Sequence, residues 1–453
     1  MWKTIAEKEL RDHLQSTRFL VAASVSTLLI VMSIWLGITH YKARVAQYEQ
    51  GVQMMLDLAS QQTNWMMVSP TAWRKVRSEY SDDPMLAAFQ FLDPTFVVLI
   101  VLSLIAILFT YNAVNGEKES GTLKLVFANR VSKAEYIVGK LVGSWLAILA
   151  PVLISFLVGV LLLVLLGVNL SASSWGQYAI FVLASILYAT CFMLLGVFVS
   201  ALTHRSSVSF LILLVVWICA VLIVPKAATM LAGRAMPVPT VDEIESKLAS
   251  YSSQTRTEGM TAIMKRSREL YRSGSEMKPE YRQKMFATLQ QEIEAKRKEM
   301  EQQITEYSAR VYEDYYNQKS GQELLAFSLA KLSPASQFQL ATMKLSGTDV
   351  ALKKRYEDAM KEYKTQYSNY AQQKGGGGGI SIRMSAGRGT PSASMTGPTQ
   401  TKIDVSEMPK FKDPEYSFGT SVVGAFFDLG LLMLFNVFAF VGAFVAFLRF
   451  DMR

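Results

Sequence analysis

Long runs of apolar residues dominate this chain of 453 residues. Six runs cover 19–38, 95–111, 141–167, 179–202, 208–224 and 421–448. Each is near or above the ~18 residues with which a helix crosses about 30 Å of hydrocarbon, and in lipid the backbone polar groups must be satisfied within the segment. The pattern therefore predicts an all-α membrane protein with six transmembrane helices. The alternative, buried helices of a large soluble core, is disfavoured because such helices rarely run this long without charge.

The residues before the first run predict a helix that lies on the membrane surface. In 1–18, Trp2, Ile5, Leu10 and Leu14 fall on roughly one helical face and the charges fall on the other. This pattern is typical of an interfacial helix, with an ordinary solvated cap as the alternative. The run at 19–38 is too long for the apolar core of a secretory signal, which favours a retained span.

Two longer segments, 39–94 and 225–418, separate the spans on the opposite side of the membrane. In the second, apolar positions from Phe286 to Tyr315 recur at steps of three, four and seven, which predicts a long amphipathic helix in a coiled-coil-like hairpin. A tyrosine stripe from Tyr356 to Tyr370 favours a helix–helix packing seam over a ligand platform. The Gly-rich stretch 375–400 cannot bury a core and predicts a flexible linker.

Charge distribution sets the predicted topology. The net charge is +9, and the short segments 1–18, 112–140, 203–207 and 449–453 hold twelve Lys and Arg against seven Asp and Glu. This excess over short loops predicts that both termini of the multi-pass protein are cytoplasmic. No basic stripe with interleaved aromatic residues is present, so the pattern disfavours a nucleic-acid partner.

The side chains needed for metal binding or nucleophilic catalysis are scarce. The two cysteines, Cys191 and Cys219, both fall inside predicted spans, so the outer segments hold no disulfide. The three histidines are not grouped with a nucleophile or with metal ligands. We therefore expect no metal site and no catalytic residue in this chain.

The charged segment 112–140 lies between the second and third spans. Glu117 and Glu119 are placed near a helix start, where carboxylates meet the positive end of the helix dipole. Leu123 and Leu125 begin an apolar cluster after them. Ser132 and Glu135 form an S-x-x-E capping box for a helix that continues into the third span. The segment is therefore predicted to be a rigid element joined to two membrane helices.

This segment resembles the signature of the permease subunits of ABC-2-type exporters. The family pattern E-x-x-S/x-G-T-L-x-x-L-L-x-x-P-V-S-R-x-E, followed by Gly-Lys, is matched at Glu117, Ser120, Gly121, Thr122, Leu123, Val131, Ser132, Lys133, Glu135, Gly139 and Lys140. Arg130 stands where the family usually has proline. The six-span layout and the large insertion before the last span are also similar to the family.

The resemblance implies a coupling helix that docks on a separate ABC ATPase, and export across a bacterial inner membrane. It also implies a second permease, either another copy of this chain or a related one, surrounded by membrane lipids. The coupling residues would be Glu117, Glu119, Ser120, Gly121, Thr122, Leu123, Leu125, Ser132 and Glu135. The chain lacks a G-x-x-x-x-G-K-[ST] phosphate loop. ATP and Mg²⁺ are therefore expected on the partner subunit, with no cofactor on this chain and no enzymatic activity of its own.

Two polar residues of the last run are candidates for lining a transport path. Asp428 and Asn436 are eight residues apart and share a helical face, although Asp428 could instead reach interfacial water. An alternative function is mechanical, in which ATP hydrolysis drives the helical outer domain to act on an extracytoplasmic protein partner without solute transport. A secondary transporter is disfavoured, because internal repeats and several intramembrane charges are lacking.

Overall fold

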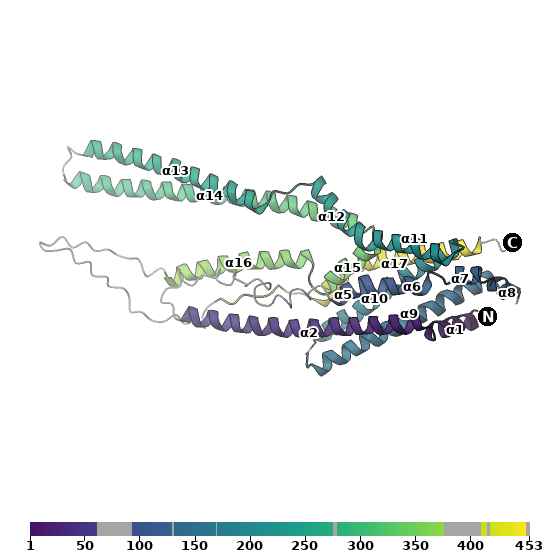
Figure 1. The fold of residues 1–453 in the computed structure, drawn as a ribbon. Coiled ribbons are helices and arrows are strands. Elements are labelled where there is room, and N and C mark those ends of the chain that lie inside the picture. Colours follow the sequence, from purple (N-terminus) through teal and green to yellow (C-terminus); the bar gives the residue numbers. More distant parts are fainter. Residues whose placement is uncertain are drawn as a thin grey trace. The chain divides into compact units, whose positions relative to one another are not determined.

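A computed structural model describes residues 1–60, 93–128, 131–168, 170–274, 279–375, 409–414 and 417–449. All regular secondary structure in these ranges is helical (Figure 1). The chain divides into two compact units, Met1–Val221 with Ser333–Arg453, and Leu222–Leu332. The expected linker at 375–400 lies almost wholly outside the described residues.

Six helical stretches of the described chain are long and apolar enough to cross a membrane, which confirms the predicted all-α membrane fold. They are α2 (Thr17–Ser60), α5 with η2 and α6 (Pro94–Val97, Val98–Leu102, Ser103–Thr110), α9 (Lys133–Leu165), α10 (Ala172–Leu202), α11 with η3 and α12 (Ser206–Trp217, Ile218–Ile223, Val224–Ala235), and α17 (Phe418–Leu448). The helix α2 continues well past residue 38. Residues 39–60 are rich in Ala, Gln, Met and Leu and contain no proline, so nothing stops the helix at the end of the apolar run.

Short polar side chains begin several of these helices. Asp93 accepts a hydrogen bond from the Phe96 amide and precedes Pro94 at the first helical position. Ser171 and Ser417 cap α10 and α17 in the same way. Such caps satisfy amide groups that have no partner within the helix, which explains why the spans begin at these residues.

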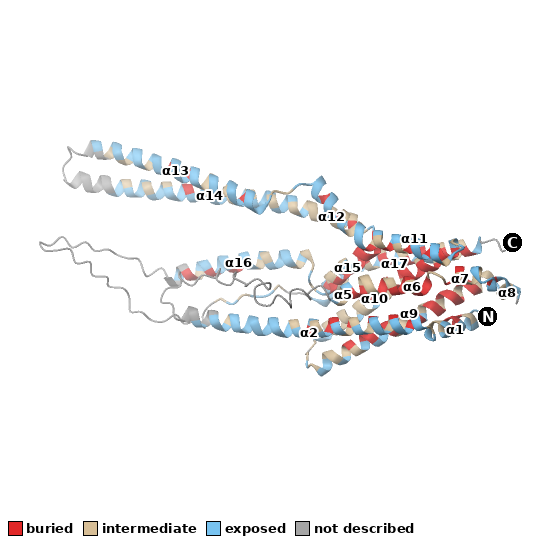
Figure 2. Cartoon of the chain, in the orientation of Figure 1, coloured by how far each residue is buried: buried red, intermediate tan, exposed pale blue. Residues whose placement is uncertain are grey.

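The core of the first unit is built around α10, which packs against α6, α9, α17 and a short helix, α15 (Pro334–Leu345). The buried residues gather in this bundle (Figure 2). The Phe338 ring of α15 stacks on the Tyr188 ring of α10 at 4.9 Å between centroids, and both side chains are fully buried. Residues 333–345 fall within the predicted outer segment 225–418, yet in the structure they pack into this bundle.

Two spans contain a π-helical turn, and each turn exposes a carbonyl that a neighbouring side chain satisfies. The Tyr188 hydroxyl donates to the Leu99 carbonyl in η2 at 3.0 Å. The Ser333 hydroxyl, at the start of α15, donates to the Ala220 carbonyl in η3. A π-turn displaces the regular helical hydrogen bonds. Tyr188 and α15 therefore both pack on and stabilise these irregular turns.

The second unit is a helical hairpin. In it α13 (Val241–Gly274) runs antiparallel to α14 (Pro279–Ala330), which also packs on α12. The Tyr251 and Tyr307 rings stack at 3.8 Å, and further along α13 the Arg266 guanidinium binds the Glu292 carboxylate at 3.0 Å. The residue later in α13, Arg266, pairs with the residue earlier in α14, Glu292, so the two helices run antiparallel. The predicted amphipathic helix from 286 to 315 is thus one arm of this hairpin.

The tyrosine stripe belongs to α16 (Val350–Gly375) and contacts an extended segment, 409–414. The Tyr356 hydroxyl donates to the Asp413 carboxylate at 2.8 Å, and the Tyr363 hydroxyl donates to the Pro409 carbonyl at 2.9 Å. The Phe411 ring lies against both tyrosine rings. The stripe is therefore a packing seam, in which the tyrosines pack against an extended segment. Tyr363 also packs against Tyr367 within α16 itself.

Candidate functional site

The segment between the second and third spans folds into two short helices, α7 (Asn115–Glu119) and α8 (Thr122–Ala128). They are joined at Gly121, whose φ of +74° falls in the left-handed region. Side chains with a Cβ rarely adopt this conformation, so glycine is required at the turn. The long α9 then begins at Lys133. The predicted capping box is confirmed, because the Ser132 hydroxyl accepts from the Glu135 amide and the Glu135 carboxylate accepts from the Ser132 amide.

A buried cation joins this segment to the N-terminal helix. The Lys140 ammonium on α9 binds the Glu9 carboxylate of α1 (Trp2–Leu14) at 2.7 Å and the Glu117 carboxylate of α7 at 2.9 Å. The exposed fractions of these side chains are 6% for Lys140, 9% for Glu9 and 18% for Glu117. The Tyr136 hydroxyl donates a further hydrogen bond to Glu117 at 2.6 Å. We call Glu9, Glu117, Tyr136 and Lys140 the Lys140 network.

Two glycines let α1 approach α9 closely. A Cβ added to Gly139 would lie 2.8 Å from the Ile5 side chain, and one added to Gly143 would lie 2.6 Å from the Glu9 Cβ. No such contact is tolerated without movement of a neighbour, so small residues are required here. The four-residue spacing of Gly139 and Gly143 therefore places both glycines on the face of α9 that contacts the N-terminal helix.

The first turn of α7 is held by the end of α10. The Ser200 hydroxyl accepts from the Val114 and Asn115 amides at 3.0 and 3.1 Å. The Asn115 side-chain amide donates to the Thr203 hydroxyl at 2.9 Å, and the Lys118 ammonium donates to the Ala201 carbonyl. These contacts fix α7 to the turn that connects α10 with α11.

Glu119 reaches across to the next span. Its carboxylate accepts from the Ser206 amide at 3.0 Å and from the Ser206 hydroxyl at 2.6 Å. Because Ser206 is the first residue of α11, Glu119 supplies the capping interaction that this helix start otherwise lacks. The segment is thus tied to α1, α9, α10 and α11 within the described residues.

The remaining side chains of the turn face outward. The exposed residues are Ser120, Gly121, Thr122, Lys124 and Leu125. The exposed fraction of Leu125 is 67%. Leu123 is buried between them and holds α8 to the core. We call the exposed set the outer face of the segment.

The nine residues predicted to couple the chain to a partner therefore divide into two groups. Ser120, Gly121, Thr122 and Leu125 lie on the outer face, whereas Glu117, Glu119, Leu123, Ser132 and Glu135 make contacts within the chain. Glu117 lies in the first turn of α7, as expected, whereas Glu119 is the last residue of that helix. Their carboxylates bind Lys140 and the start of α11. Arg130, where the chain departs from the family pattern, lies outside the described residues.

Sequence reasoning missed the inward partners Glu9, Tyr136 and Asn115. One signal was available for Glu9, because its neighbours Ile5, Ala6 and Leu10 are apolar and are four, three and one residues away on α1. Of the apolar face predicted for α1, Ile5 and Leu10 pack against the core, while Trp2 and Leu14 are exposed. Ala6 and Glu9 are buried beside them, and the placement of α1 on the membrane surface stays a prediction.

His13 adds a titratable group to the same helix. Its imidazole lies 3.6 Å from the Glu9 carboxylate, and its ring packs beside Phe109 at 5.8 Å. Burial lowers the pKa of His13, and the nearby Glu9 carboxylate only partly offsets this effect. The N-terminal helix therefore docks with a neutral histidine at neutral pH.

The two candidate path residues occupy helix interfaces. Asp428 is completely buried and its carboxylate binds the Lys344 ammonium of α15 at 2.6 Å. The Asn436 side-chain amide donates to the Leu187 carbonyl of α10 at 3.2 Å and to the Leu432 carbonyl at 2.9 Å. Asp428 thus joins α15 to α17 instead of reaching interfacial water. A role in lining a path stays a prediction.

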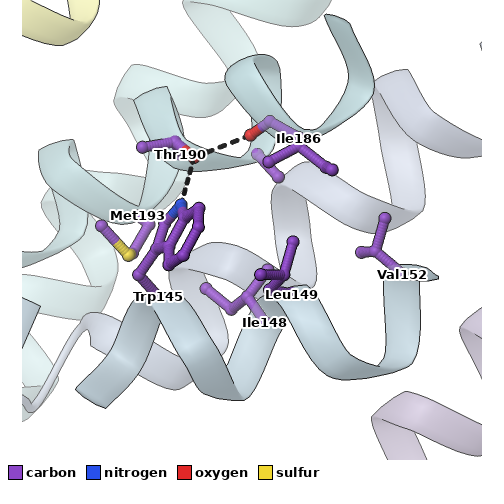
Figure 3. A pocket seen from close by; sticks show the side chains of 8 residues that line it. Trp145, Ile148, Leu149, Val152, Ile186, Thr190 and Met193 are labelled. Atoms are coloured by element: carbon purple, nitrogen blue, oxygen red, sulfur yellow. Dashed lines mark hydrogen bonds between the residues drawn. The ribbon is translucent and has the colours of Figure 1, made fainter. Parts of the chain in front are cut away.

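A cavity between α9 and α10 is too small for a cargo molecule. Its volume is about 10 Å³, which is roughly the space of one water molecule. Figure 3 shows the Trp145 indole donating to the Thr190 hydroxyl at 3.0 Å, which in turn donates to the Ile186 carbonyl at 2.7 Å. These contacts lock the two helices together. Within the described ranges, no three His, Cys, Asp or Glu side chains gather as metal ligands would.

Comparison with known proteins places this arrangement in a family. The family model described as "ABC-2 family transporter protein" matches residues 3–452. The probable ABC transporter permease protein NosY of Stutzerimonas stutzeri is 32% identical over 125 residues. That alignment covers 27% of this chain and 45% of the relative. Since the family model extends over nearly the whole chain, this multi-pass membrane protein belongs to the ABC-2 family of transporter proteins.

Proposed function

We propose that this chain is the membrane-embedded permease of an ABC exporter, and that it receives motion from a separate ATPase subunit through α7 and α8. The ATPase would carry ATP and Mg²⁺, because the sequence here contains no phosphate loop. The positive charge of the short loops supports an orientation with α1, α7 and the C-terminus in the cytoplasm of a bacterial inner membrane. Two permease copies would form the complete transporter.

The proposal rests on one observation: the segment that presents the outer face is bound on its inner side to the neighbouring helices. The outer face presents Ser120, Thr122 and Leu125, while the same segment is bound inward to four other helices. A push on the outer face is then transmitted to the spans, because closely packed helices move as rigid bodies. A segment that was loosely attached would absorb the motion instead.

Binding of the ATPase tests the proposal directly. The chain is purified with an affinity tag from its native membranes, and the copurifying ABC ATPase is quantified by mass spectrometry. We expect Leu125→Glu to reduce the bound ATPase at least tenfold, because a charge replaces an apolar contact at the centre of the outer face.

The matched control for this experiment is Leu324→Glu on α14. The exposed fraction of Leu324 is 69%, close to the 67% of Leu125, and Leu324 belongs to the second unit. We expect this control to retain the ATPase. Full retention of the ATPase by Leu125→Glu would show that α8 is not the docking element.

A mechanical function is the second candidate, and the helical hairpin is the observation that favours it. Within the second unit, α12 and α13 both pack on α14. The Gln322 side chain of α14 donates to the Met236 carbonyl at 2.6 Å, which fastens the hairpin to the end of α12. Movement of this helix would be passed to a hairpin that could act on an extracytoplasmic protein.

Removal of the hairpin separates the two candidates. In the variant, residues 241–318 are replaced by a short Gly-Ser loop, which keeps α12 and Gln322. An exporter should keep its cellular function, its bound ATPase and its ATP hydrolysis. A mechanical transmitter should keep the ATPase and its hydrolysis but lose the cellular function.

A further inference from the structure

A buried hydrogen bond links the two π turns, η2 and η3. Ser103, the first residue of α6, directly follows η2, and Trp217, the last residue of α11, directly precedes η3. The Trp217 indole donates to the Ser103 hydroxyl at 2.8 Å. Ser103 is completely buried, and the exposed fraction of Trp217 is 7%. The second and fifth spans are therefore fastened to each other at the residues that border their irregular turns.

The Leu99 carbonyl inside η2 accepts two hydrogen bonds. The Ser103 hydroxyl donates one at 2.5 Å, and the Tyr188 hydroxyl of α10 donates the other at 3.0 Å. Because Ser103 also accepts from Trp217, a continuous path of hydrogen bonds leads from Leu99 to the end of α11. Hydrogen bonds in such a chain polarise one another, so a change at one end is felt at the other.

The short helix α15 forms a second connection between the turns. Its Ser333 hydroxyl donates to the Ala220 carbonyl in η3. Its Phe338 ring stacks at 4.9 Å on the ring of Tyr188, whose hydroxyl binds η2. Ser333, Phe338 and Tyr188 are all buried. A displacement of either turn is thus passed to the other through α15 and Tyr188 as well as through Trp217.

We propose that η2 and η3 act as one joint, in which both turns change conformation together, and that Tyr188 and Trp217 are the positioning residues that couple them. A π turn holds one residue more than an α turn, so conversion of one into the other rotates the adjoining helix by about 100°. A rotation at η2 would carry Ser103 away from Trp217. Unless η3 follows, buried polar groups lose their partners, which is costly.

The position of η2 in the chain gives the joint a use in transport. The eight-residue helix α6 and a short turn separate η2 from α7, and α7 belongs to the segment through which motion is proposed to enter. This use rests on the proposed function, whereas the coupling of the two turns does not. Motion of α7 and α8 would reach the fifth span as well as the second.

Hydrogen exchange of the full chain in lipid nanodiscs tests the coupling. The backbone amides of 98–103 report on η2, and those of 218–221 report on η3. Tyr188→Phe keeps the stacked ring and removes the hydroxyl that binds η2. We expect exchange about fivefold faster in η2, the effect of one lost hydrogen bond, and roughly twofold or more faster in η3. Trp217→Phe, which removes the direct bond, should accelerate exchange in both turns.

Tyr178→Phe is the matched control on the same helix. The Tyr178 hydroxyl donates to the Phe156 carbonyl at 2.9 Å, which is a bond of the same kind to the regular helix α9. We expect this control to leave exchange in both turns unchanged. Ser333→Ala provides the reverse test, because Ser333 binds η3 and should accelerate exchange in η2 when it is removed.

Two results with the isolated chain would overturn the proposal. One is unchanged exchange of η2 in Tyr188→Phe. The other is independent behaviour, in which Tyr188→Phe accelerates η2 alone and Ser333→Ala accelerates η3 alone.

The same measurement on the complex with the copurified ATPase tests the use in transport. Trapping of the ATPase with ATP and vanadate should change exchange in both turns of the natural sequence. In Tyr188→Phe, ATP hydrolysis should remain, while the change in η3 should fall below half of its natural size. A natural complex in which trapping alters η2 alone would overturn the joint. If no ATPase copurifies, the proposed function fails, and exchange of the isolated chain still decides whether the turns are coupled.

Discussion

Replacement of Lys140 by methionine is expected to release the N-terminal helix from α9. Methionine matches the length of the lysine stem but leaves the carboxylates of Glu9 and Glu117 facing each other without a cation. The side chains are largely buried, with exposed fractions of 6%, 9% and 18% for Lys140, Glu9 and Glu117. Removal of one partner from a buried ion pair costs about 3–5 kcal/mol. At 1.4 kcal/mol for each factor of ten, α1 should undock about 10² to 4 × 10³ times more often.

Hydrogen exchange measures this undocking directly. The chain is placed in lipid nanodiscs, and exchange of the backbone amides in the second half of α1 is followed by mass spectrometry. In Lys140→Met, these amides should exchange about 10² to 4 × 10³ times faster, while the amides of α10 should keep their protection. The control is Lys124→Met, which removes the same charge from the exposed surface of α8 and should leave α1 unchanged.

A charge-compensated variant decides whether the ion pairs or the packing hold α1. In Glu9→Gln with Glu117→Gln and Lys140→Met, no buried charge is left without a partner, so most of the protection should return. The reasoning is refuted if Lys140→Met exchanges at the rate of Lys124→Met. It is also refuted if the triple variant exchanges as fast as Lys140→Met alone.

Three further predictions concern packing, a second ion pair and pH. Gly143→Leu should raise exchange in α1 at least tenfold, since overpacking costs about 1–3 kcal/mol, whereas Gly430→Leu in open space should not. Lys344→Met should lower the melting temperature, because it leaves the buried Asp428 carboxylate without its cation. The double variant Lys344→Met with Asp428→Asn should restore the melting temperature. Fluorescence-detected size exclusion after heating measures both. Because burial lowers the pKa of His13, α1 should dock fully above about pH 6.5 and loosen as the pH falls toward that lowered pKa. The loosening is measured as faster amide exchange in α1, after correction for the pH dependence of the intrinsic exchange rate. His13→Phe should abolish it.

The spans were predictable because their signal is local. Twenty apolar residues in a row have few alternatives to a membrane helix, and the Ser132–Glu135 cap depends only on residues three apart. The inward contacts of the segment were not predictable in this way. Glu9 and Lys140 are 131 positions apart in the chain, and no periodicity in either helix indicates that the two side chains meet.

The short helix α15 shows a second limit of the sequence pattern. It has 12 residues, too few to span, and it follows a long polar segment, so hydropathy alone places it outside the membrane. Only the three-dimensional partners reveal its position. The buried Phe338 needs Tyr188 on α10, and the cation of Lys344 needs Asp428 on α17.

The pairing of α15 with α17 has a consequence for biogenesis. During translation α15 leaves the ribosome before α17, because Asp428 is synthesised 84 residues after Lys344. Until the final span enters the bilayer, Lys344 has no Asp428 to neutralise it. Nascent chains that stop before residue 417 should therefore hold this helix loosely and be preferred substrates for membrane quality-control proteases, so the last span completes the fold.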